Sequence, residues 1–345
     1  MKPRRGRRVV RMTLVALVGL VVCASPAAAD PAKPGDYRSI VTSVEPPTNA
    51  VQVKVVGGDG FLDVKVQRGH DVTVLGYDGE PWLHITPDGT VLENQNSPAT
   101  YLNVNRYARV TVPPNVDPKA APDFTRIATG GEYTWHDHRI HWMSPDHPPN
   151  HRAGDVIFPD WQVQLTVDGT PTVAHGRLTW VKDVNPLPYL AVIAVLAALL
   201  VVFAGKKVWL ASAAVLVVAV LALYTGWRAW ASIPSAGGPN PLELWLPGVG
   251  VAAAALAVAF VRKAWSVIFT LAAVSALAAW CIERNAVLFN PVLPTRLSFG
   301  VDRTVTAAAL GICIGAAVVA VRAGVVFPKL PALDFGDDED GDSDA

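Results

Sequence analysis

Three histidines and two tryptophans lie within eleven residues, 133–143, which read YTWHDHRIHWM. His147 and His151 follow shortly afterwards, and all eight histidines of the chain lie between positions 70 and 175. Neutral imidazole is the commonest metal ligand in proteins, and it titrates near neutral pH. A cluster this dense predicts either a metal site or a structural role for the imidazole hydrogen bonds.

The spacing of the histidines suits a shared metal ion. If residues 133–140 form a strand, His136 and His138 lie on one face, about 7 Å apart. His141 can join them after a bend in the chain, and His84 can reach the same end of a β-sandwich through its loops. No cysteine lies near these residues, so imidazole and carboxylate ligands favour copper or zinc. We therefore predict a divalent metal site at His136, His138, His141 and His84.

A structural corner explains the same residues without a metal. The motif is rich in large apolar side chains that can close a β-sandwich, with its imidazoles hydrogen-bonded to backbone carbonyls. Asp137 and Arg139 would then pair on the solvent side. The surface from Trp135 to Trp142 would be available to an envelope protein partner. The sequence leaves both interpretations open.

Catalytic and nucleic-acid-binding patterns are absent from the sequence. There is no phosphate-binding glycine loop, no GxSxG and no HExxH, so we predict that the protein is not an enzyme. Residues 30–188 carry 13 Lys+Arg and 19 Asp+Glu. This acidic balance, without a basic stripe, argues against nucleic acid as a partner.

Five apolar runs of 18–20 residues follow the polar first half of the chain. They are Leu187–Gly205, Val208–Trp227, Leu244–Val261, Ala264–Ile282 and Thr304–Val321. Each is long enough to cross roughly 30 Å of hydrocarbon as a helix. We predict an all-α transmembrane bundle of about five helices in residues 187–322, in contact with membrane lipid.

Ionisable residues are confined to the ends of these runs. Glu243, for example, stands just before the third run, where snorkelling or the membrane interface can accommodate it. Ionisable groups in the middle of a span mark ion and proton pathways, and the runs contain none there. An anchor or assembly platform is therefore favoured over a transporter.

The charges at the chain ends and turns predict the orientation in the plasma membrane. Residues 1–29 have a basic start, an apolar run and three consecutive alanines, as in a signal peptide. The short turns at Lys206-Lys207 and Arg262-Lys263 favour the cytoplasmic side. Residues 30–186 would then be extracytoplasmic, and the acidic tail, residues 323–345, cytoplasmic. The loop 283–303 opposes this orientation, because it carries three arginines on the outer side.

Alternating side chains predict that the extracytoplasmic segment, residues 30–186, is all-β. Val51, Val53 and Val55 alternate with polar residues, and the same pattern returns in residues 161–167. Glycine-rich and Asp-Gly turns separate the runs, and no amphipathic helix is visible. We predict seven to nine strands in an antiparallel sandwich of immunoglobulin or cupredoxin-like shape.

Two segments carry a family resemblance. GYDGEPWLHITPDGTVLENQNSPATYLN and GGEYTWHDHRIHWMSP resemble parts of exported membrane proteins from actinobacteria, the high-GC Gram-positive bacteria. The resemblance covers mainly residues 36–182 and implies an envelope location without a specific chemistry. The plan of the domain is also similar to the β-sandwich of exported copper-resistance proteins. Those proteins use an N-terminal histidine that this chain lacks, since the mature chain would begin at Asp30.

Overall fold

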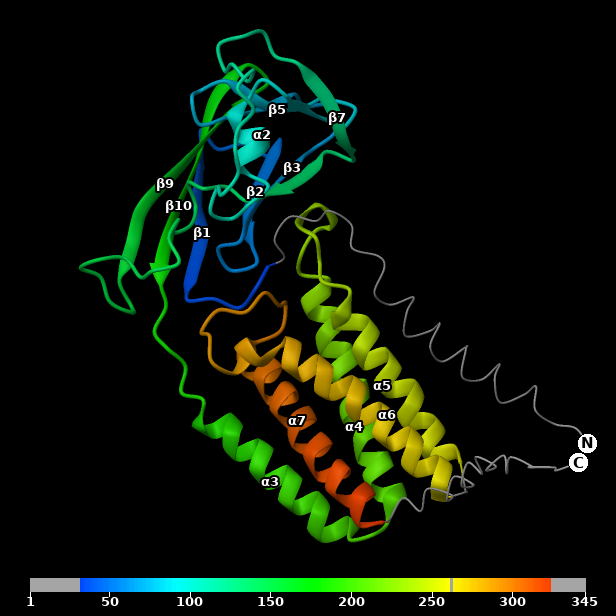
Figure 1. Cartoon of the computed structure of the whole chain (residues 1–345). Coiled ribbons are helices and arrows are strands. Elements are labelled where there is room, and N and C mark those ends of the chain that lie inside the picture. The colour runs from blue at the N-terminus through cyan, green and yellow to red at the C-terminus, as the bar shows by residue number, and fades with distance from the viewer. Residues whose placement is uncertain (1–31, 261–262, 324–345) are drawn as a thin grey trace, which may run out of the picture.

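The chain forms a β domain that stands at one end of a bundle of five long helices (Figure 1). The computed structural model describes residues 32–260 and 263–323. The predicted signal peptide, residues 1–29, and all but the first residue of the predicted acidic tail lie outside these ranges. The predicted order of a β domain followed by membrane-type helices is confirmed.

The strands of the β domain form two antiparallel sheets. The larger sheet has the order β1-β10-β9-β4-β5-β6-β7, and the smaller has the order β2-β3-β8. The strands are β1 (Tyr37–Glu45), β2 (Val51–Val56), β3 (Phe61–Val66), β4 (Val72–Leu75), β5 (Pro81–Ile85), β6 (Thr90–Asn94), β7 (Phe124–Thr129), β8 (Glu132–Trp135), β9 (Val156–Val167) and β10 (Thr170–Trp180). This two-sheet arrangement confirms the predicted β-sandwich, with one strand more than the seven to nine expected.

The alternating apolar residues of the strands build the core of the domain. In β9, Trp161, Val163 and Leu165 are buried, while the intervening Gln162 and Gln164 are exposed. Successive side chains of a strand point to opposite faces of its sheet, so this alternation fixes which face packs inward. The burial pattern confirms that the alternation in the sequence marks strands with one buried face.

The domain contains one element that the sequence did not predict. Helix α2 (Pro98–Leu102) follows Ser97, whose Oγ accepts a hydrogen bond of 3.2 Å from the backbone N–H of Ala99. The Ser97 hydroxyl also donates to the side chain of Glu80. Five residues are too few to show helical periodicity. Only the capping serine and the proline after it indicate a helix start.

Five helices in the described part of the chain are long and apolar enough to cross a membrane. They are α3 (Leu187–Ala204), α4 (Val208–Trp230), α5 (Leu242–Ala259), α6 (Lys263–Glu283) and α7 (Phe299–Arg322). Each coincides with one of the predicted apolar runs, so the chain is a multi-pass membrane protein. The largest difference between a predicted run and the observed helix is at α7. This helix begins at Phe299 rather than Thr304 and therefore includes Asp302 and Arg303.

A buried ion cluster joins α5, α7 and the end of α6 at the β-domain side of the bundle. The Arg284 guanidinium donates to a Glu243 carboxylate oxygen at 2.5 Å and also to Asp302. Its Cζ lies 4.8 Å from the ring centre of Trp280. The sequence favoured snorkelling or a membrane interface for Glu243. Glu243 lies in the first turn of α5, at the span end that the sequence predicts, but snorkelling is wrong, because the largely buried carboxylate packs against Arg284.

The β domain contacts the bundle through the loop between α6 and α7. Gly35 and Val292 exchange two backbone hydrogen bonds of 3.0 Å, and the Asn290 side chain donates to the Pro34 carbonyl at 3.5 Å. Arg303 holds the loop in place, since its guanidinium donates to three backbone carbonyls there. Backbone pairing of this kind sets the position of the domain on the bundle.

Gly226 of α4 lies against the backbone of α5. A Cβ at this position would stand 1.9 Å from the backbone oxygen of Glu243. We expect Gly226→Ala to lower the free energy of unfolding by about 1–3 kcal/mol, because α5 must move away. Gly248→Ala in α5 is the matched control, since its Cβ would meet nothing within 4 Å. Thermal unfolding of the full-length protein in detergent measures both, and equal stability of the two variants would contradict this prediction.

Candidate functional site

The histidine motif forms a turn after a short strand. β8 ends at Trp135, and the residues that follow have no strand structure. The Asp137 side chain accepts the backbone N–H of Arg139 at 3.0 Å, and the Asp137 carbonyl accepts that of Ile140 at 3.2 Å. An aspartate that bonds the backbone two residues ahead favours a turn over a strand. The predicted strand over residues 133–140 is therefore wrong beyond Trp135.

A buried ion pair holds this turn together. The guanidinium of Arg139 donates to both carboxylate oxygens of Asp137, at 2.9 and 2.7 Å, and the indole of Trp135 donates to one of them at 2.9 Å. Burial alone would raise the pKa of Asp137, but the Arg139 charge and these hydrogen bonds outweigh it and lower the pKa. The pairing of Asp137 with Arg139 agrees with the structural-corner interpretation, but the carboxylate is buried and does not face solvent.

Each of the three motif histidines donates a ring N–H to a backbone carbonyl. His136 Nδ1 lies 2.6 Å from the Gly60 oxygen, and His138 Nε2 lies 3.0 Å from that of Asn105. His141 Nδ1 lies 3.1 Å from the carbonyl oxygen of the next residue, and its Nε2 is buried without a hydrogen-bond partner. The rings of His138 and His141 are nearly perpendicular, with centres 5.6 Å apart. These bonds determine which ring nitrogen carries the proton.

The buried His141 makes the stability of the protein depend on pH. Burial and the nearby Arg106 charge lower the pKa of His141 to about 3. Between pH 6.5 and 3 the unfolded chain binds a proton that the folded chain does not, so stability falls as the pH falls. We expect His141→Asn, which keeps a donor, to reduce this loss by about 1 kcal/mol per pH unit. Chemical denaturation at about pH 7, 6 and 5 measures the loss, and parallel profiles of wild type and variant would contradict the prediction.

The predicted metal ligands are not brought together into a metal site. No group of three or more His, Cys, Asp or Glu side chains in residues 32–260 and 263–323 is placed to hold a metal ion. His84 lies in β5, where its Nε2 is 2.8 Å from a carboxylate oxygen of Asp71. His136, His138 and His141 each use one ring nitrogen on a backbone carbonyl. Copper or zinc binding at these four histidines stays a prediction.

The two tryptophans of the motif have different environments. Trp135 is 4% exposed and packs edge-on against Trp82 in the core, with ring centres 5.0 Å apart. Trp142 is only partly buried, and its indole N–H donates to the Asp146 carbonyl at 2.6 Å. A partner at this surface would therefore contact Trp142 and not Trp135.

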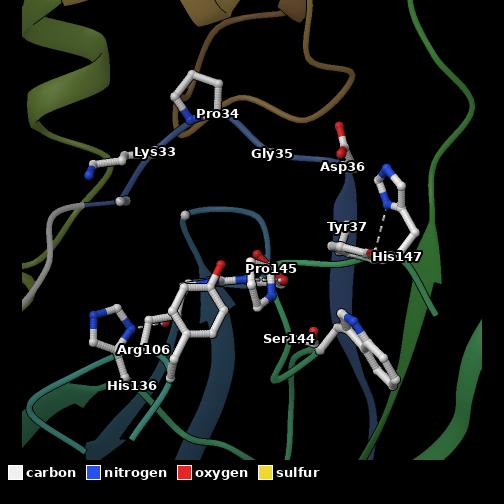
Figure 2. A pocket seen from close by; sticks show the side chains of 16 residues that line it. Lys33, Pro34, Gly35, Asp36, Tyr37, Arg106, His136, Ser144, Pro145 and His147 are labelled. Carbon is white, nitrogen blue, oxygen red and sulfur yellow. Dashed lines mark hydrogen bonds and ion pairs between the residues drawn. The ribbon is translucent and has the colours of Figure 1, made fainter. Parts of the chain in front are cut away.

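A cavity of about 320 Å³ lies beside the histidine turn. Figure 2 shows the chain from Lys33 to Asp36 passing along it, with His136 and Arg106 on one side and His147 on another. Four regions that are distant in sequence meet here: the start of β1, the turn between β2 and β3, the segment around Arg106, and the histidine motif with the residues that follow it. Among the four predicted metal ligands, His136 is the one that lines the cavity.

The charges around this cavity balance, since Lys33 and Arg106 stand against Asp36 and Asp59. Arg106 donates to the buried Asp59 carboxylate at 2.6 Å. The Tyr37 hydroxyl lies 3.4 Å from His147 Nδ1, and the His147 ring stacks on Trp180 with centres 4.4 Å apart. Such a site offers aromatic faces and hydrogen-bonding groups with little net charge. It suits a polar, uncharged ligand or a chain segment better than a strongly charged one.

Most of the residues that line this cavity carry no recognisable signal in the sequence. Asp36, Tyr37, Asp59 and Arg106 belong to no motif, and their separations in the chain carry no periodic signal. His147 belongs to the histidine cluster, but the sequence alone indicates no function for it. Comparison of the chain with protein-family models, curated proteins and solved structures gives no match.

Proposed function

We propose that this chain is a non-catalytic envelope protein whose β domain binds a segment of a protein partner in the cavity beside the histidine turn. The observation that carries the proposal is the cavity itself, which four segments distant in sequence build together. The rings of Tyr107 and Trp142 in its lining supply apolar contact area at low entropic cost, and its hydrogen-bonding groups supply orientation.

The attachment of the domain to the bundle supports a role as a fixed platform. The backbone bonds between Gly35 and Val292 lie next to the cavity wall formed by residues 32–37. A domain held in this way presents its cavity at a constant height above the membrane. Binding then requires little reorganisation of the domain, which favours affinity.

A photo-crosslinking experiment tests the partner proposal. Benzoylphenylalanine replaces Tyr107 in the cavity lining or, as a matched control, Phe124 of β7, which is also partly buried. In intact cells we expect a discrete protein adduct from position 107 alone. The purified partner should then bind the full-length protein, and Tyr107→Ala/Trp142→Ala should weaken binding at least about tenfold. Identical adducts from both positions, or unchanged affinity in the double variant, would overturn the proposal.

Metal handling is the competing function, and one observation favours it. Nε2 of the buried His141 has no hydrogen-bond partner, and the His138 ring lies beside it. Calorimetric titration of the untagged full-length protein with Cu(II) and Zn(II) separates the two functions. Affinity no better than millimolar supports the partner proposal. Micromolar affinity that disappears in His136→Ala/His138→Ala would support metal handling instead.

The orientation in the membrane is part of the same proposal, with the β domain outside the cytoplasm. The turn with Lys206-Lys207 lies at the end of the bundle away from the domain (Figure 1). Basic residues in short turns favour the cytoplasmic side. The three arginines of the loop 283–303 argue against this orientation less than their number suggests. Two of them, Arg284 and Arg303, are buried and hydrogen-bonded inside the protein.

Reporter fusions check this orientation. Alkaline phosphatase, which needs the oxidising exterior for its activity, is joined to the chain after Trp180 or after Lys207. We expect high activity at the first position and little at the second, because the two positions lie on opposite sides of α3. The reverse pattern would place the β domain in the cytoplasm.

A further inference from the structure

A second cavity, of about 530 Å³, lies in the cleft between the β domain and the loops of the bundle that face it. One wall comes from β1 and β2, with Arg38 and Lys54. The other comes from the segment that follows α4 and from the loop before α7, which contributes Arg296. This cleft is distinct from the cavity beside the histidine turn, although both adjoin Gly57.

The cleft carries an excess of positive charge. Its lining holds three cationic side chains, Arg38, Lys54 and Arg296, against the single carboxylate of Glu132, which gives a net charge of +2. Lys54 lies 3.0 Å from a buried carboxylate oxygen of β3, and the Glu132 carboxylate is itself paired with a lysine at 2.9 Å. In the described part of the chain, no ion pair engages Arg38 or Arg296. Both arginines are exposed and available to an anion.

Exposed aromatic residues place the cleft at the depth of the lipid headgroups. Trp227 and Trp230 are exposed on the last turns of α4, and Trp245 is exposed on the first turn of α5. Tryptophan gathers where hydrocarbon meets the headgroup layer. The cleft wall begins at Ala231, directly after Trp230. A headgroup of the adjacent leaflet can therefore reach the cleft from the side.

We propose that this cleft binds the phosphate of an anionic phospholipid headgroup from the leaflet on the β-domain side. The planar guanidinium group presents a fork of N–H donors that matches phosphate oxygens, so Arg38 and Arg296 together form a phosphate clamp. Free inorganic phosphate shares this chemistry. The lipid is the favoured source, because the cleft lies beside the exposed tryptophans. Lipid binding in this cleft does not depend on the binding of a protein partner in the cavity beside the histidine turn.

Native mass spectrometry of the full-length protein in neutral detergent tests the proposal. The protein is titrated with phosphatidylglycerol or phosphatidylcholine that carries the same acyl chains, and bound lipids are counted. We expect phosphatidylglycerol to bind at least about tenfold more tightly, and Arg38→Glu/Arg296→Glu to abolish that preference. The Arg38→Gln/Arg296→Gln variant removes the two charges without reversing them, and it should also weaken the preference for phosphatidylglycerol. Agreement between the two double variants shows that the lost preference does not come from misfolding of the charge-reversed protein.

A matched charge reversal controls for nonspecific attraction. Arg68 in the β3–β4 turn and Arg126 in β7 are exposed and form no ion pair in the described structure. Arg68→Glu/Arg126→Glu changes the net charge equally and should keep the lipid preference. Equal loss in both double variants would overturn the proposal. Saturable binding of inorganic phosphate without a preference for phosphatidylglycerol would also overturn it, in favour of a free-anion site.

Discussion

Replacing Asp137 with alanine is expected to lower the free energy of unfolding of the β domain by about 3–5 kcal/mol. The carboxylate is fully buried and accepts hydrogen bonds from the Trp135 indole and from the backbone and guanidinium of Arg139. Its removal leaves a mostly buried guanidinium without a counter-charge. The lost acceptor also releases the turn that carries all three motif histidines.

Tryptophan fluorescence during urea denaturation of the full-length protein measures this loss. Asp137→Asn distinguishes the loss of charge from the loss of side-chain volume. It keeps the volume but places a neutral amide against the Arg139 donors. We expect it to be nearly as destabilising. Asp160→Ala is the control, since the Asp160 carboxylate is hydrogen-bonded to the His175 ring at 2.9 Å on the exposed surface. Its midpoint should match that of wild type. An Asp137→Ala midpoint equal to that of Asp160→Ala would refute the structural role of the ion pair.

Replacing Arg284 with glutamine is expected to destabilise the helix bundle by a similar amount, about 3–5 kcal/mol. Arg284 is 5% exposed and bridges Glu243 of α5 and Asp302 of α7. Without it, two carboxylates remain inside the bundle with no cation between them. Charge that is buried at membrane depth and unpaired is more costly than the same charge in water.

Neutralising the whole cluster distinguishes charge balance from lost packing. The triple variant Glu243→Gln/Arg284→Gln/Asp302→Asn removes all three charges and should recover most of the stability. Arg296→Gln is the control from the same loop, because Arg296 is exposed and its loss should leave the thermal transition unchanged. Thermal unfolding in detergent micelles compares the variants with wild type. A triple variant no more stable than Arg284→Gln would show that packing, not charge, holds this end of the bundle.

The two cavities lead to separate functional tests. The cavity beside the histidine turn has balanced charges, with Arg106 paired to Asp59, whereas the cleft keeps Arg38 and Arg296 outside any ion pair of the described residues. A loss of partner binding in cavity variants would leave lipid binding unchanged. Loss of the lipid preference would leave the partner proposal untouched, since different residues carry the two proposals.

The sequence alone determined the architecture of the protein. A strand with one buried face must alternate apolar and polar residues, and a helix that crosses a membrane must stay apolar for about 20 residues. Both rules act over short stretches of chain, so the β-sandwich and the five helices could be located without knowing their contacts. The start of α7 was misplaced because Asp302 and Arg303 look like solvent-facing residues until their partners are known.

The tertiary structure decided the site. Composition located the histidine motif, but the ring of His136 bonds to Gly60 and that of His138 to Asn105, residues that no local pattern connects with them. The cavity beside the turn and the basic cleft likewise combine side chains that lie far apart in sequence. Hydrogen bonds and ion pairs depend on positions within a few tenths of an ångström, and such positions are set only when the strands and helices pack together.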